Sequence, residues 1–434
     1  MTSQDTPAAH IALAEAAAAA GRTVATEPAL AARPVRFVGE SRTFWRLLLR
    51  GAVLLAVTLG IYRFWLATDV RRFLWSNTEI AGDHLEYNGM PTELLVGFLI
   101  AIALLIPLNL IFFLLTLSAV GGLATVLGFP VLFVLGQFAV YRARRYRLTR
   151  TVLRGVRFHQ TGSAWRYAAC ATFWWIVVVL TLGLAYPFMQ ASLERYKMRH
   201  THYGDLPGRF EASGWSLFVR GALMWLLVMG PFVFAIIAVI GGVDWDGLGE
   251  AMSGGEQDMA RVIMTDGLQA ALWLGVSGVL TSVLLAALLF PIFQAMVLRW
   301  WLSGIRFGAL TVRSHLLKRR IYGAYLRFLG YAALFTVLLL VAATIGAAVF
   351  GFGLLTGGPG YEIGGTLASV ALYVVTMLGF STIYQATVRL ALWRHGAESV
   401  EIERLDALDQ VKATGKPGSA VGEGLADALN VGGI

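Results

Sequence analysis

Long apolar runs separated by short polar connections dominate the chain between residues 43 and 395. A helix needs roughly 20 apolar residues to cross the ~30 Å hydrocarbon core of a bilayer. The run at 94–141 is long enough for two such helices, with a break near a Gly-Gly pair. Further runs are each long enough for one: 216–242, 267–297, 328–355 and 366–392. The pattern therefore predicts six transmembrane helices arranged as three hairpins.

Two further apolar runs, 43–66 and 165–189, are about one span long, and basic residues indicate how they lie. The connections at 142–166 and 298–327 are rich in arginine and contain no acidic residue, so the positive-inside rule places both in the cytoplasm. These two basic connections would lie on opposite faces of the membrane if both shorter runs crossed it fully. The sequence therefore favours six spans plus two re-entrant or interfacial segments over the alternative of eight spans.

The remaining connections and the two ends complete the predicted topology. The connection at 243–266 is acidic, and the connection at 357–365 is Gly-rich, so both can lie outside. Either count of spans leaves both termini in the cytoplasm. We expect residues 1–34 to be a disordered tail, residues 35–395 to form the membrane domain, and residues 396–434 to be a second tail that begins with an amphipathic helix at 397–413.

Composition supports an integral membrane protein, which the apolar runs make an all-α helical bundle. The 434 residues are 57% hydrophobic and only 14% charged, which is too little charge to cover a soluble surface of this size. The net charge of +9 comes from arginines beside apolar runs, so anionic lipid headgroups are better partners for them than nucleic acid. The single cysteine, Cys170, has no partner for an internal disulfide.

A short pattern recurs where apolar segments end on the basic side. A glutamine stands five residues before an arginine in each of three segments. Related segments at 64–73 and 384–393 contain an arginine or glutamine near the same place. Where a helix leaves the bilayer, this pattern places an amide at the headgroup boundary and, just over one turn later, a guanidinium that extends toward the lipid phosphates. The candidates for a cytoplasmic pathway mouth or for lipid-phosphate contacts are Gln190, Arg195, Gln294, Arg299, Gln385, Arg71 and Arg142.

A second pattern consists of short extended stretches on the cytoplasmic side. Each contains an aromatic or branched apolar residue, and most contain glycine, just before the next hydrophobic run; they lie at 35–39, 84–89, 156–162, 208–214 and 305–310. Together the patterns indicate an internal repeat made of an extended piece, an apolar segment or hairpin, and a basic exit. Two alternatives to a true repeat stay open. In the first, the basic exits match only because all helices that leave a membrane share this composition, and in the second, the extended stretches are simple turns before helices.

The same residues carry a family resemblance. The stretches 58–98 and 181–214 both contain Thr-Leu-Gly, an Arg-aromatic pair and a trailing Gly-Asp. In these features the chain resembles the YjgN family of multi-pass bacterial inner-membrane proteins, whose molecular function is not established. The resemblance covers roughly residues 35–395. It implies location and class, and it supplies no catalytic residue.

Catalytic and metal-binding patterns are weak. His200, His202 and Asp205 are the nearest to a metal constellation, but they stand in a hydrophilic turn without a second histidine or cysteine cluster. The charged residues of the segment at 83–86 are more typical of a structural cluster. No phosphate-binding loop, nucleophile elbow or zinc-protease motif occurs. We therefore expect no enzyme activity, no catalytic residue, no metal and no cofactor.

Two classes of function remain. The proposed span cores lack acidic, histidine and lysine side chains, which argues against ion-coupled pumping. The first class is a passive transporter or channel for a small solute or lipid, because the breaks at Thr-Leu-Gly are typical of segments that line a cavity. The second is an envelope scaffold that docks a protein partner, another copy of itself or anionic lipid through its basic face and the 397–413 helix. A cavity between hairpins would favour the first.

Overall fold

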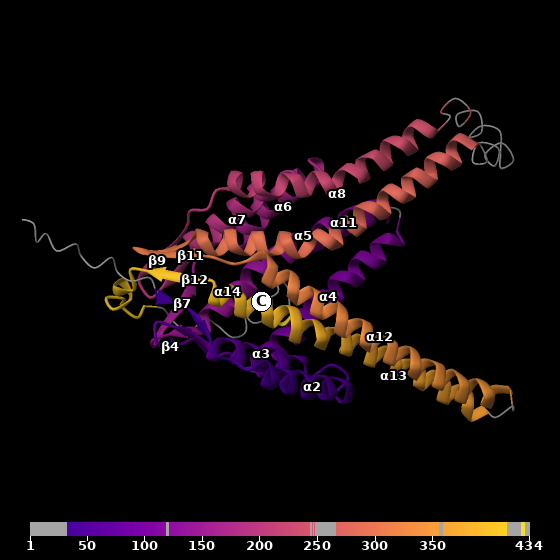
Figure 1. The fold of residues 1–434 in the computed structure, drawn as a ribbon, viewed down its shortest axis with the longest axis horizontal. Helices are drawn as coiled ribbons and strands as arrows, with labels where there is room; N and C mark the ends of the chain where they lie inside the picture. Colours follow the sequence, from indigo (N-terminus) through magenta and orange to yellow (C-terminus); the bar gives the residue numbers. More distant parts are fainter. Residues whose placement is uncertain are drawn as a thin grey trace, which may run out of the picture.

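The computed structural model describes residues 33–118, 121–243, 245, 247, 266–355, 359–414 and 427–429. Most of the predicted N-terminal tail and most of the acidic connection at 243–266 lie outside these residues. Within them, helices and short strands alternate in a regular order, and the elements keep their labels from Figure 1.

Six helices are long and apolar enough to cross a membrane, as the sequence predicts. They include α4 (Pro91–Thr116), α5 (Gly121–Thr149), α8 (Gly214–Gly242), α11 (Asp266–Gly304) and α12 (Lys318–Leu355). The sixth begins in α13 (Pro359–Tyr384) and continues through the π-helical turn η1 (Gln385–Arg389) and α14 (Leu390–Glu398). Many large apolar side chains on these helices are exposed, because their solvent is lipid rather than water. The protein is therefore a multi-pass membrane protein.

The two shorter apolar segments each fold back on themselves. One forms α2 (Ser41–Val57) and α3 (Arg63–Ser76), and the other forms α6 (Ala164–Leu180) and α7 (Tyr186–Arg199). The rings of Phe44 and Phe73 lie 5.0 Å apart, so the start of α2 packs beside the end of α3. Tyr167 and Tyr196 make the corresponding contact across the second pair. Both ends of each hairpin thus lie on the same side of the molecule.

The Thr-Leu-Gly motif makes the sharp turn at the tip of each short hairpin. Thr58 and Thr181 both donate from Oγ1 to the carbonyl four residues earlier, and both accept a backbone N–H four residues later. The following leucine has a φ of 50° in both hairpins, and the glycine after it has a φ near 90°. Glycine alone adopts that second conformation without strain. The repeated sequence is therefore a repeated helix-ending turn.

The extended stretches of the sequence form one ring of strands. In order, the strands are β1 (Arg33–Pro34), β2 (Arg36–Phe37), β3 (Thr78–Ile80), β4 (Asp83–His84), β5 (Glu86–Tyr87), β6 (Thr151–Leu153), β7 (Val156–Gln160), β8 (Thr201–Tyr203), β9 (Leu206–Phe210), β10 (Ile305–Phe307), β11 (Leu310–Ser314) and β12 (Val400–Glu403). All pairs are antiparallel, and nine strands follow one another from β5 round to β12 and β1. One residue separates β1 from β2, and one separates β4 from β5, while β3 joins β2 to β4. The nine-stranded sheet and the three-stranded sheet β2-β3-β4 are therefore joined into a ring by chain continuity at Val35 and Leu85 rather than by hydrogen bonds between strands.

Helices and strands are joined by the same contact in three places. Thr78, Thr151 and Thr201 are each the first residue of a strand, and each donates from Oγ1 to the carbonyl four residues earlier. The donor therefore covers a carbonyl at the end of the preceding helix that has no helical partner. The indole of Trp75 donates to Thr151 Oγ1, and the indole of Trp393 donates to Thr78 Oγ1. Thr78 and Thr151 therefore each connect the strand that they begin to a helix of another repeat.

Helix packing follows the ring of strands. Neighbouring pairs contact one another from α2–α3 through α4–α5, α6–α7 and α8–α11 to α12–α13, and α13 returns to α2. Figure 1 shows the labelled strands gathered at one end, with the α8–α11 and α12–α13 pairs running away from them and diverging. The basic helix ends therefore meet around the strands.

The segment at 397–413 differs from the prediction of an amphipathic helix. α14 ends at Glu398, β12 pairs with both β1 and β11, and a short 3₁₀ turn follows at Leu405–Leu408. The alternation in Val400-Glu401-Ile402-Glu403 fits a strand as well as a helix, and tertiary pairing decides between them. This segment belongs to the fold rather than to a free tail.

Ring closure predicts a specific cross-link. Pro34 and Glu401 are direct partners between β1 and β12, and Cα atoms of antiparallel partners lie close enough for a disulfide. In a Cys170→Ala background, Pro34→Cys with Glu401→Cys should cross-link under mild oxidation, as measured by gel shift after proteolysis between the two positions. Pro34→Cys with Glu403→Cys, two residues out of register, is the control. Equal cross-linking of both pairs would contradict this closure.

The hairpin arrangement also predicts a labelling pattern. Glu86 and Arg209 are exposed residues of strands that follow the two short hairpins, so both should be cytoplasmic. Single cysteines there, again without Cys170, should react with an impermeant maleimide only after the cells are permeabilised, whereas Gly254→Cys should react in intact cells. Reaction of either strand position in intact cells would mean that a short hairpin spans the membrane.

Candidate functional site

Basic side chains from three separate elements converge where the helices reach the strands. Arg71 lies near the end of α3, Arg147 near the end of α5, and Arg389 at the end of the π-helical turn η1. Arg389 is close enough to the other two to repel their charges. π-Helical turns occur often at functional sites because they displace side chains from the regular helical register. The chain thus builds a buried arginine cluster from Arg71, Arg147 and Arg389.

An acidic residue from far along the chain occupies this arginine cluster. Asp427 meets Arg71 end-on, with Nη1 to Oδ2 at 2.5 Å and Nη2 to Oδ1 at 3.1 Å, and Arg147 Nε lies 3.6 Å from Oδ1. The side chains of Arg71 and Asp427 are only 4% and 1% exposed. Burial alone would lower the pKa of Arg71, but Asp427 and Tyr87 raise it above its ordinary value. The ion pair is therefore shielded from solvent.

A second buried ion pair lies beside the first. Glu194 of α7 contacts Lys197 one turn later, Arg144 of α5 at 3.7 Å, and the indole N–H of Trp301 at 3.0 Å. Burial alone would raise the pKa of the Glu194 carboxyl, but Lys197 and Arg144 hold it below its ordinary value. Lys197 also feels the charge of Arg147, so the two groups form one electrostatic region.

Positive charge is in excess in this region. Among the described residues, it contains five basic side chains, those of Arg71, Arg144, Arg147, Lys197 and Arg389, and two acidic ones, Glu194 and Asp427. Within the described residues, the one hydrogen bond that Arg389 donates is to Gln385 Oε1, at 3.3 Å. Arg147 Nη1 is buried and has no hydrogen-bond partner among them. Such groups attract further oxyanion ligands.

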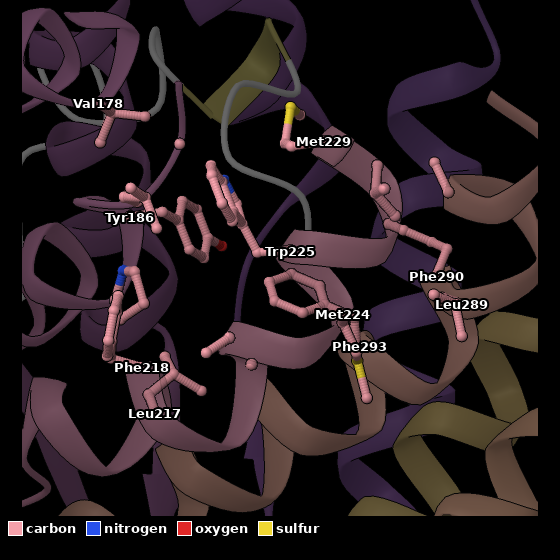
Figure 2. A pocket seen from close by; sticks show the side chains of 17 residues that line it. Val178, Tyr186, Leu217, Phe218, Met224, Trp225, Met229, Leu289, Phe290 and Phe293 are labelled. Atoms are coloured by element: carbon pink, nitrogen blue, oxygen red, sulfur yellow. The ribbon is translucent and has the colours of Figure 1, made fainter. Parts of the chain in front are cut away.

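An apolar pocket of about 380 Å³ lies farther from the strands. It is enclosed by the tip of the α6–α7 hairpin and by the facing sides of α8 and α11 (Figure 2). Tyr186, Trp225 and Phe293 come from these three parts and line it. The indole of Trp225 donates to the carbonyl of Leu182 at 2.8 Å, which fixes the hairpin tip against α8. The volume lies within the range of small-ligand pockets.

Helix α7 connects the pocket to the charged region. Tyr186, Gln190 and Glu194 follow one another at four-residue spacing, so they share one face of the helix. Tyr186 lines the pocket and hydrogen-bonds Gln190, and Glu194 belongs to the buried charges. Among the described residues, neither Gln190 nor Glu194 lines the pocket, and the Tyr186 phenol is the link between them and its apolar walls.

The structure divides the residues predicted from the sequence. Arg71 lies in the buried cluster, and Gln385 accepts from its neighbour Arg389. Gln190 and Gln294 are half-buried and bond to Tyr186 and Tyr325. The remaining three are set apart from the cluster: Arg195 and Arg299 are exposed, and Arg142 is half-buried on α5.

Most charged residues of this buried region cannot be recognised from the sequence. Arg144, Arg147 and Lys197 stand among other basic residues, so nothing in the sequence separates buried arginines from those that face lipid. Glu194 had a usable signal, because it is the one acid in the Gln-to-Arg exit segments, and an acid there implies a buried partner. Asp427 had no signal, since its position depends on how the chain end packs.

The histidine segment does not assemble a metal site. His202 stacks on His159 of the neighbouring strand with ring centroids 5.0 Å apart, and Asp205 accepts the backbone N–H of Lys412. His200 instead bonds the carbonyl of Tyr196. Over the described residues, no group of three potential metal ligands occurs.

Comparison with known proteins gives a family and no function. No curated protein matches the chain. No solved structure matches it either. A family model described as a bacterial protein of unknown function, DUF898, matches residues 32–428, nearly the whole chain, and the YjgN family is the same family. The chain therefore belongs to the DUF898 family of bacterial proteins.

Proposed function

We propose that this membrane protein is a passive transporter of a lipid-like molecule with an apolar tail and a polar head. The pocket between the α6–α7 tip, α8 and α11 is the observation that carries the proposal. Its walls suit an apolar chain, and the Tyr186 phenol in its lining is hydrogen-bonded to Gln190, one turn before the buried Glu194 on the same face of α7. Such a combination suits an amphipathic molecule rather than a small ion.

The nature of the pocket walls supports passive movement. The residues around the pocket are aliphatic, aromatic, methionine, glycine and proline, with no ionisable group other than the Tyr186 phenol. Coupled transporters place carboxylates, histidines or lysines at the substrate site to bind the driving ion. An apolar solute can instead enter from the bilayer and leave by the same route.

The short hairpin gives the pocket a means of changing shape. Its tip is held to α8 by the Trp225 to Leu182 hydrogen bond, and Leu182 itself is 47% exposed. The other described backbone hydrogen bonds of the tip run to residues of the same hairpin, so the tip can move against α8 without breaking them. Movement of the tip would open or close the pocket.

The alternative, a docking scaffold, has less support. It rested on the basic face together with an amphipathic helix at 397–413, and of these two features the helix is replaced by β12 of the ring. The ring of strands also leaves no long edge onto which a partner could add a strand.

Filling the pocket provides the test. Ala222→Trp puts an indole among the lining residues of α8, whereas Leu223→Trp puts the same group on a neighbouring residue that is 66% exposed and outside the lining. Displacing two methylenes of a bound chain costs about 1.6 kcal/mol, so lipid affinity should fall by roughly tenfold in Ala222→Trp alone. Binding of a fluorescent lipid to purified protein and its exchange between leaflets of proteoliposomes would measure this. Unchanged binding and exchange in Ala222→Trp would refute the proposal.

A further inference from the structure

We infer that the buried arginine cluster is a binding site for a phosphate group, and that the chain's own Asp427 occupies it as a substitute ligand. The inference is independent of the lipid pocket, because it rests on different residues at the strand end of the helices. It begins from the geometry of the Asp427 carboxylate. Both of its oxygens are engaged by the two terminal nitrogens of Arg71, the fork-to-fork arrangement in which guanidinium binds carboxylate or phosphate.

The charge of the site fits a phosphate better than it fits a carboxylate. The Asp427 carboxylate contacts Arg71 and Arg147, and Arg389 is near enough to both arginines to repel them, so positive charge remains after Asp427 is seated. A phosphate monoester carries about −1.5 to −2 at neutral pH and offers three acceptor oxygens. It could use the buried Arg147 Nη1, which has no partner within the described residues, and Arg389, whose single described hydrogen bond is to Gln385.

Few contacts hold the segment that carries Asp427, so a phosphate could displace this residue from the arginines. Besides the ion pair, the described part of this segment is held by Arg63, which donates to the carbonyl of Ala428, and by Ala428 itself, which packs among Phe64, Leu94 and Tyr146. The elements that carry Arg71 and Arg389 pack together in one core, the helix that carries Arg147 packs with α6 and α7 in another, and neither of these cores contains Ala428. Departure of Asp427 therefore leaves the walls of the site in place.

A phosphate could come from two sources. The arginines lie at the basic ends of the helices, where the positive-inside rule places the cytoplasm and the lipid headgroups. A soluble phosphate compound could reach them from the cytoplasm, and a lipid with a phosphomonoester headgroup could reach them from the bilayer. The chemistry at the arginines is the same in both cases.

The first experiment compares two carboxylates of the same terminal segment. Asp427→Asn removes the buried ligand, while Asp409→Asn removes a carboxylate that is 75% exposed and pairs with Arg154. Binding of inorganic phosphate is measured by thermal shift on full-length protein in phosphatidylcholine nanodiscs, with chloride at equal ionic strength as the reference. Asp427→Asn should bind phosphate at least about tenfold more tightly than wild type, since it loses a charged competitor. Asp409→Asn should match wild type.

Additional variants distinguish a phosphate site from a purely structural role for Asp427. Adding Arg389→Gln to Asp427→Asn should reduce the gain in phosphate affinity. If Asp427→Asn does not fold, Ala428→Cys without Cys170 keeps Asp427 in place, and its buried thiol should react faster with maleimide when the site ligand displaces the segment. Acceleration by inorganic phosphate identifies a soluble ligand, and acceleration only by phosphatidic acid in the nanodisc identifies a lipid headgroup. No acceleration by either, or equal phosphate affinity in Asp427→Asn and Asp409→Asn, overturns the inference.

Discussion

Closure of the strand ring is the constraint on which the rest of the structure depends. Its strands have two to five residues, too few to form a stable hairpin alone. Most strands are held by neighbours on both sides, whereas β1, β2, β4 and β5 each pair on one side only, and the last pair is supplied by β1 and β12 from opposite ends of the chain. These four edge strands have two residues each, so the unpaired edges of the described sheets are short, and short edges limit aggregation.

The ring in turn fixes where the helix ends lie. Because each strand pair follows directly on a helix end, five helix pairs are held side by side with their basic ends together. Arginines that would repel one another on a flexible chain are thereby brought into one buried region. Their repulsion must be offset by acids, which explains why Glu194 and Asp427 are buried beside them.

The two candidate sites lie in different surroundings. The pocket beside Trp225 lies among apolar helices that face lipid, whereas the arginine cluster lies at the strand end, among backbone and charged groups. Glutamine and tyrosine on α7 lie between them. A passive lipid pathway and a phosphate site at its polar end are therefore compatible within one molecule, although each rests on its own residues.

By itself, the sequence determined the six long helices, the Thr-Leu-Gly turns and the extended stretches, because hydropathy and turn chemistry depend on local residue order. It also determined the family. Tertiary structure decided the closed ring, the use of Val400–Glu403 as a strand rather than a helix, and the burial of some arginines beside exposed ones such as Arg195. Those features depend on pairing between residues far apart in the chain, as between Arg71 and Asp427, and no local pattern encodes that pairing.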